Sequence, residues 1–312
     1  MNANSEAIII FCSKLCLGDG IEPLEPKEWS ELSQLMLQKA MQPSDLLKCS
    51  QEDFHAKLGL PAQYAERLIR LTDRAGSLAF ELERYENTGI KIVTRADKEY
   101  PLKLKKKLGN SCPPLFYYAG DLNILNTASI GYVGSRTVSA PDTDFTEQIV
   151  RKTVQRGYGV VTGGAKGVDS VSESEALRCG SAVIEYMSDS MIRRLKSSTA
   201  IRAIQDGKLI LLSLVKPDAG FNTGIAMMRN RFIYAQSEAT VVVKSDFDKG
   251  GTWTGAIEDL KNHWCPLFCW DNAAYKGNRE LIRRGAIPIR DDWDGNVSSS
   301  PKPQAIQTSL FD

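Results

Sequence analysis

The fold is decided by SIGYVGSRTVS (residues 129–139) and GYGVVTGGAKGVDS (residues 157–170), which a helical segment separates. In each stretch an apolar run ends in a glycine turn that carries one cation, Arg136 or Lys166. Glycine has no Cβ, so the backbone N–H groups of such turns can approach a phosphate closely. The N-terminus of the following helix also favours an anion. Two such loops at one edge of a parallel sheet are where an α/β protein binds its ligand.

The same alternation of strand and helix continues to about residue 292. Apolar runs predict strands at residues 129–134, 158–163, 182–187, 208–215, 239–244, 265–270 and 286–289. Helical patterns lie between them, and single helices between strands imply right-handed crossovers and a parallel sheet covered on both faces. The predicted fold class is α/β, with an extended Rossmann-like, doubly wound and mostly parallel sheet.

Composition restricts the kind of partner. The chain has 312 residues and a net charge of +1, so its overall charge would not attract a polyanion. Any nucleic-acid site must therefore be a local basic patch. Its 7 cysteines have no disulfide-like pattern. No secretory leader is visible, and the first apolar run is too short to span a bilayer. We therefore expect a cytoplasmic, reduced protein.

The composition changes along the chain predict three parts. Residues 1–85 have near-helical apolar spacing and form an N-terminal helical module, either a small bundle or a module that touches nucleic acid. Residues 86–292 form the Rossmann-like domain. Its lysine run at residues 103–107 is more typical of a solvated helix face than of a phosphate track. Residues 293–312 lack apolar periodicity, which predicts a flexible tail.

Four loops with glycine or basic residues are expected to meet at the carboxyl edge of the sheet. Gly134-Ser135-Arg136 is the first, and GGAKGVD (residues 163–169) is the second. The third is Arg229-Asn230-Arg231 near a helix start, where we expect Arg229 and Asn230 inward and Arg231 on an outer phosphate. The fourth is Lys249-Gly250-Gly251-Thr252, a turn before a helix. The set indicates a polyphosphate or nucleic-acid backbone as ligand, because each loop offers donors and none offers an evident acid–base pair.

Two smaller questions concern single residues of these loops. Asp169 most simply caps the following helix, with a contact to a sugar hydroxyl as the alternative. Bases of a nucleic acid could stack on an aromatic side chain, and Trp253, Tyr234 and Phe232 are the candidates.

The matching stretches IGYVGSR, TGGAKGVDSVSESEAL, RNRFIYA, GGTWTGA and LIRRGAIPI identify a family. From Tyr100 to about Arg290 the chain resembles the DNA-processing protein A (DprA/Smf) family. The resemblance implies binding of single-stranded DNA, assistance in loading a recombinase during DNA uptake and recombination, a homodimer, and neither a cofactor nor a catalytic step. The ligand-facing residues that it implies are Gly134, Ser135, Arg136, Gly163, Gly164, Lys166, Gly167, Asp169, Arg229, Asn230, Arg231, Gly250, Gly251 and Thr252.

Several departures from the family pattern indicate a divergent branch. Lys166 stands where arginine is common, Leu214 follows Ser213 where an acid is usual, and Cys269-Trp270-Asp271 replaces a proline-glycine pair. We also expect no C-terminal winged helix. These departures leave open whether the role is transformation, repair or phage defence.

Other functions were weighed against DNA binding. A nucleotide-cleaving enzyme of the same superfamily would use Glu258 on a ribose or a water, and a nucleotide sensor would use the same pocket. Cys265 and Cys269 fit a buried strand better than a zinc site, which needs four ligands. The two histidines have no neighbouring serine nucleophile, so a Ser-His-Asp hydrolase is disfavoured.

The last residues, QTSLFD, suggest a partner. Gln307, Leu310 and Phe311 resemble the short peptide by which bacterial repair and replication proteins bind the sliding clamp. Thr308 replaces a more usual leucine, which should weaken such a contact. The alternative is an apolar terminus that packs back on the domain.

Overall fold

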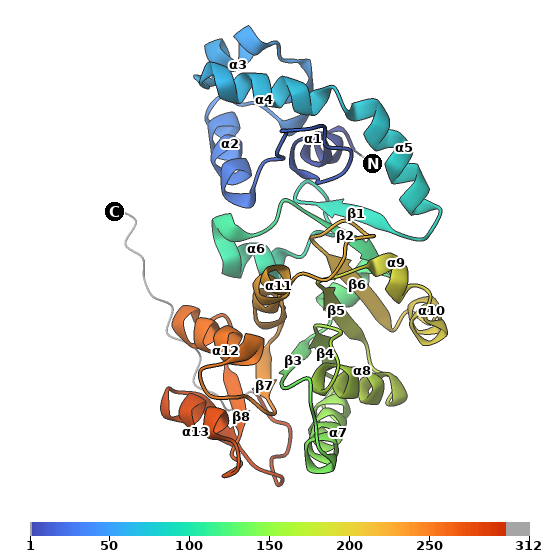
Figure 1. The fold of residues 1–312 in the computed structure, drawn as a ribbon, viewed down its shortest axis with the longest axis vertical. Helices are drawn as coiled ribbons and strands as arrows, with labels where there is room; N and C mark the ends of the chain where they lie inside the picture. The colour runs from blue at the N-terminus through green and yellow to red at the C-terminus, as the bar shows by residue number, and fades with distance from the viewer. Residues whose placement is uncertain (1, 298–312) are drawn as a thin grey trace. The chain divides into compact units, whose positions relative to one another are not determined.

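The computed structural model describes residues 2–297 (Figure 1). Its contacts divide the chain into two compact units, Met1–Asn123 with Met187–Asn222, and Ile124–Tyr186 with Thr223–Asp312. The domain boundaries at residues 86 and 293 stay a prediction. Gln307, Leu310 and Phe311 lie outside the described residues, so clamp binding stays a prediction too. Within the described part of the chain, no helix is both long and apolar enough to cross a membrane.

The first unit begins with helices, as its apolar spacing predicts. They are α1 (Ala3–Cys12), α2 (Pro26–Gln38), η1 (Pro43–Lys48), α3 (Gln51–Leu58), α4 (Ala62–Thr72) and α5 (Ala75–Glu86). Local signals set their ends: Ser50 caps the N-terminus of α3, and Gly59 ends it in the left-handed region at φ 66°. Large apolar side chains such as Phe11, Trp29 and Phe54 are fully buried between these helices.

Three antiparallel strands complete the first unit. Strand β2 (Leu115–Ala119) pairs antiparallel with β1 (Lys91–Thr94) and with β6 (Leu209–Ser213). The connecting helices are α6 (Leu102–Leu108), η2 (Gly109–Ser111), η3 (Leu122–Asn126), α9 (Met191–Arg194) and α10 (Ser198–Gln205). The lysine run lies on α6, which buries Leu104 and exposes Lys105 and Lys106. Lys103 and Lys107 are half-buried, so the interpretation of that run as a solvated helix face is confirmed only for its two central lysines.

The second unit contains the parallel sheet. Its strands are β3 (Ser129–Val133), β4 (Gly159–Thr162), β5 (Val183–Met187), β7 (Ala239–Val242), β8 (Leu267–Trp270) and β9 (Ile287–Ile289). They lie in the order β5-β4-β3-β7-β8-β9, and each strand is parallel to its neighbours in this series. The chain therefore winds outward in both directions from β3 and β7, which confirms the doubly wound α/β fold. A ligand site is expected where that direction reverses.

Helices cover both faces of this sheet. They are α7 (Ala140–Gln155), α8 (Val168–Arg178), α11 (Thr223–Gln236), α12 (Gly250–Asn262) and α13 (Lys276–Arg283). Helix α7 packs against α8, and α11 packs against α12 (Figure 1). Phe145, Ile149 and Val150 form the buried stripe of α7, and Phe145 stacks on Trp270 with ring centroids 4.0 Å apart. This packing on both faces holds the strand ends, and so the loops after them, in place.

Candidate nucleic-acid interface

Backbone hydrogen bonds tie together the loops after β3, β4 and β7. The N–H of Ser135 donates to the carbonyl of Lys244 at 2.9 Å, and the N–H of Val168 donates to the carbonyl of Ser135 at 3.3 Å. These loops come from neighbouring strands, and β3 and β7 flank the point where the winding reverses. The first two predicted loops therefore lie beside the segment that leads from β7 to the fourth. The third predicted segment, residues 229–231, lies in the middle of α11 and not near a helix start.

The loop after β4 touches the loop after β3 at Gly167. Its φ is +81°, and a Cβ there would lie 2.2 Å from the Ser135 carbonyl oxygen and 2.8 Å from the Arg136 Cα. Only glycine permits this approach. Arg136 and Lys166 are both exposed, and both are within one residue of the contact. Two exposed cations therefore project from touching loops.

The glycine pair of the same loop lies over a buried arginine. The guanidinium of Arg229 is so close to Gly163 that a Cβ there would lie 1.3 Å from Nη1. Nη1 also lies 3.9 Å from Oδ2 of Asp169, and Arg229 is only 5% exposed. Arg229 thus supports the loop from beneath, on the side away from solvent. A Cβ on the other glycine, Gly164, would meet the buried Glu185 at 2.0 Å.

Asp169 does not cap the following helix, so that sequence interpretation is wrong. It lies in the first turn of α8, and its carboxylate accepts hydrogen bonds from the N–H groups of Gly163 at 3.2 Å and Ala165 at 3.3 Å. Burial raises the pKa of Asp169, and Arg229 and these two N–H groups offset only part of that effect. The two N–H groups are occupied by Asp169, so Lys166 is the clearest donor that this loop offers to a ligand.

The rest of the arginine motif on α11 faces α12. Asn230 donates from Nδ2 to the carbonyl of Gly251 at 3.1 Å, and a nitrogen of Arg231 lies 3.4 Å from Oε1 of Glu258. The side chains of Arg231 and Glu258 are 28% and 33% exposed. Arg231, expected on an outer phosphate, is therefore paired with a carboxylate.

The turn before α12 is open to solvent. Lys249 precedes the first residue of the helix, Gly250 has φ +77°, and both are exposed. Gly251 and Thr252 are half-buried. A 13-residue helix concentrates unpaired N–H groups at its first turn, so this end favours an anion.

Beneath the loops lies a charged cluster that the sequence does not reveal. Asp142 is fully buried and accepts hydrogen bonds from Ser139, from the Tyr275 hydroxyl and from Nζ of Lys244, the last at 3.0 Å. Burial alone would raise the pKa of Asp142, but these hydrogen bonds outweigh it and hold the pKa below its usual range. The cluster joins α7 to Lys244 in the loop after β7, and so it positions both loops.

We expect Asp142→Asn to lower the free energy of unfolding by about 2 kcal/mol at neutral pH, because it breaks a charged and buried hydrogen-bond network. The depressed pKa means that this stabilisation is present above the unfolded pKa of about 4 and is lost as pH falls below it. Urea denaturation of both proteins across pH measures the difference. A difference that persisted unchanged at the lowest pH would contradict the role given to the carboxylate.

A second polar side chain missed from sequence is Asn278, in α13. It is fully buried, accepts from the N–H of Ser245 at 2.8 Å, and donates to the carbonyls of Val243 and Trp270 at 2.9 Å each. It links the ends of β7 and β8. Nothing in its sequence neighbourhood distinguishes it from a surface asparagine.

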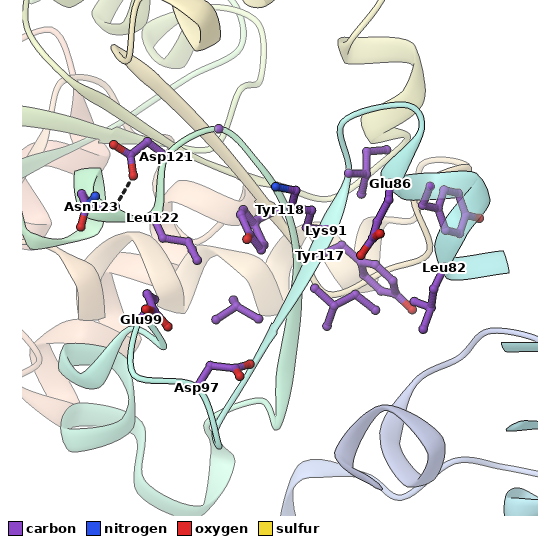
Figure 2. Close-up of a pocket in the computed structure, with 15 residues that line it drawn as sticks. Leu82, Glu86, Lys91, Asp97, Glu99, Tyr117, Tyr118, Asp121, Leu122 and Asn123 are labelled. Carbon is purple, nitrogen blue, oxygen red and sulfur yellow. Dashed lines mark hydrogen bonds between the residues drawn. The ribbon is translucent and has the colours of Figure 1, made fainter. Parts of the chain in front are cut away.

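A hollow in the first unit has the wrong charge for a nucleic acid. It encloses about 470 Å³, and Glu86, Asp97, Glu99 and Asp121 line it together with Lys91. Figure 2 shows these carboxylates on both sides of Tyr118. Burial raises the pKa of Tyr118, and all four carboxylates raise it further. Such a field repels phosphate, so the loops of the second unit are the better candidate for a nucleic-acid interface.

Comparison with known proteins agrees with this architecture. A sequence model of the family described as DNA recombination-mediator protein A matches residues 91–294, well over half of the chain. The chain belongs to this family. Among curated relatives, the DNA processing protein DprA of Bacillus subtilis is 26% identical over 270 residues, which cover 81% of this chain and 89% of that protein.

Solved structures of DNA processing protein A share the fold. The protein from Streptococcus pneumoniae matches with a TM-score of 0.64 at 18% identity, covering 85% of this chain and 95% of that one. The protein from Helicobacter pylori, whose structure describes its binding of single-stranded DNA, matches with a TM-score of 0.52 at 23% identity. That match covers 65% of this chain and 92% of the Helicobacter chain. These likenesses confirm a Rossmann-like fold for this family member.

Proposed function

We propose that this protein binds single-stranded DNA through phosphate contacts at the loops after β3 and β4, and that it assists recombinase loading in DNA uptake or recombination. One observation carries the proposal. The contact at Gly167 brings Arg136 and Lys166, both exposed, to one edge of the parallel sheet. Arg136 can donate two parallel hydrogen bonds to one phosphate, and Lys166 supplies a point charge to the next.

Membership of the DNA recombination-mediator protein A family supports this function, as does the Helicobacter relative that binds single-stranded DNA. We propose three protein partners for this chain: the recombinase, a second copy of the chain and the sliding clamp. The open turn at Lys249 and Gly250 adds a helix N-terminus at which a further phosphate can bind.

The same geometry disfavours a nucleotide-cleaving enzyme. A catalytic Glu258 would need its carboxylate directed to a ribose or a water, but Arg231 lies 3.4 Å from it. Arg229, the residue that such an enzyme would place on phosphate, is buried beside Asp169. A non-catalytic binding role uses the exposed Arg136 and Lys166. It leaves the Arg231–Glu258 and Arg229–Asp169 pairs intact.

The test is a titration of the protein with a labelled thymidine oligonucleotide and, in parallel, with mononucleotides. We expect binding of the oligonucleotide alone. Each neutralised phosphate of a single strand contributes about −0.7 to the slope of log affinity against log salt concentration. Two cations therefore predict a slope of about −1.4, or a steeper one, between about 50 and 200 mM salt. Tight mononucleotide binding would favour the sensor, and release of free base would favour the enzyme.

A further inference from the structure

Phosphate contacts leave the bases of a single strand without a binding surface. Proteins that bind such strands without sequence preference usually add an aromatic side chain on which a base stacks. The three candidates indicated by the sequence are buried: Trp253 is 6% exposed, and Tyr234 and Phe232 are each 1% exposed. None of the three offers a ring face to a base.

Phe247 is different. It lies in the loop after β7 and is 37% exposed, so its ring is open to solvent at a sheet edge where an apolar side chain gains little. The same loop contains Lys244, whose carbonyl accepts the hydrogen bond from Ser135, the residue before Arg136. The exposed ring and the exposed cation therefore lie on loops that are directly bonded.

The Phe247 ring contacts Trp253, and a lysine lies over one of its faces. Its edge-to-face contact with Trp253 has ring centroids 5.1 Å apart and an interplanar angle of 74°. The ammonium of Lys276 lies 4.6 Å from its centroid. A lysine side chain is flexible and exposed here, so it can leave the ring to a flat ligand. Trp253 contacts the ring, and movement of the Lys276 ammonium would leave the face beneath it to a base.

The charges around Phe247 cancel. Asp246 and Asp248 flank it in the chain, whereas Lys249 follows and Lys276 lies over the ring, so two charges of each sign surround it. A phosphate gains little there, whereas an uncharged, planar base needs no net charge and gives up only the exposed Lys276 contact with the ring. The local chemistry therefore suits a nucleobase and not the backbone that carries it.

We propose that Phe247 is a base-stacking residue for a single-stranded nucleic acid whose phosphates are held by Arg136 and Lys166. This inference rests on the proposed function and adds the part of the ligand that the cations do not contact. Because stacking involves no ion exchange, its loss lowers affinity without changing the salt dependence.

The test is the affinity of Phe247→Ala for a labelled thymidine oligonucleotide over a range of salt concentrations. Stacking of one base predicts a loss of roughly ten- to a hundredfold, with the salt slope of the parent. Phe247→Trp should keep the affinity, whereas Phe247→Leu, which is apolar but not aromatic, should lose most of it. Phe80→Ala is the matched control, because Phe80 is a phenylalanine 72% exposed on α5 of the first unit.

An oligonucleotide of abasic sites separates stacking from other effects. The parent and Phe247→Ala should bind it equally, since it offers no base. Unchanged affinity of Phe247→Ala for the thymidine strand would overturn the inference while leaving phosphate binding intact, as would parent-like binding by Phe247→Leu. Failure of the parent to bind any oligonucleotide would overturn the proposed function itself. Urea denaturation of each variant checks that it is folded.

Discussion

Gly167→Ala is expected to lower the free energy of unfolding by about 3 kcal/mol, because it combines left-handed strain with a clash against backbone atoms. The new Cβ would lie 2.2 Å from the Ser135 carbonyl oxygen. The atoms that the Cβ would meet belong to the backbone of Ser135 and Arg136, which cannot rotate away as a side chain can. The loops after β3 and β4 must therefore separate. Urea denaturation measures the stability, and we expect the same variant to lose most of its affinity for single-stranded DNA.

Gly109→Ala is the matched control for this substitution. Gly109 has φ +53° and ψ −126°, close to the φ +81° and ψ −129° of Gly167, but no atom within 4 Å of its Cβ position. The control isolates the backbone strain, which should be about 1–2 kcal/mol. Equal losses of stability in the two variants would mean that the contact between the loops adds nothing beyond backbone strain.

Replacing both Arg136 and Lys166 by alanine should weaken binding of a single strand roughly a hundredfold and leave the stability unchanged. Each side chain is exposed, so little packing is lost, but two charge-assisted phosphate contacts disappear. The slope of log affinity against log salt concentration should become shallower by about 1.4. Titrations of a labelled oligonucleotide at several salt concentrations measure both quantities.

A double variant elsewhere controls for net charge. Lys105 and Lys106 are exposed on α6 of the first unit, and their replacement by alanine removes the same two charges. The control should bind almost as the parent does. If it were weakened as much as the Arg136 and Lys166 variant, binding would depend on overall charge and not on the two loops.

The strands and their positions could be predicted from the sequence because most strands of the parallel sheet, namely β3, β4, β5, β7 and β8, are buried on both faces. The run at residues 129–134, for example, became β3, in which every residue from Ser129 to Val133 is buried. Pairing was harder to predict. The run at residues 208–215 is β6, which pairs antiparallel with β2 about ninety residues earlier in the chain. Apolar periodicity shows that a strand exists but does not identify its neighbour.

At the candidate site, the glycine turns could be predicted and the roles of the side chains could not. Arg229 and Arg231 are two residues apart, yet one supports a loop from beneath and the other pairs with Glu258. Which of them is buried depends on how α11 rotates against the sheet. Phe247 was missed for the same reason, since exposure of a single aromatic residue is a property of the folded loop and not of its sequence.

The carboxylate of Asp169 and the guanidinium of Arg229 give the loop after β4 an unusual property. Glycine normally makes a segment flexible, and ordering a backbone residue costs about 1–2 kcal/mol of conformational entropy. Here the two side chains hold the loop from the protein side, so that entropy is lost when the chain folds and not when a strand arrives. The loop is preorganised, and the residues that most favour flexibility build a rigid platform that a strand can occupy without first ordering it.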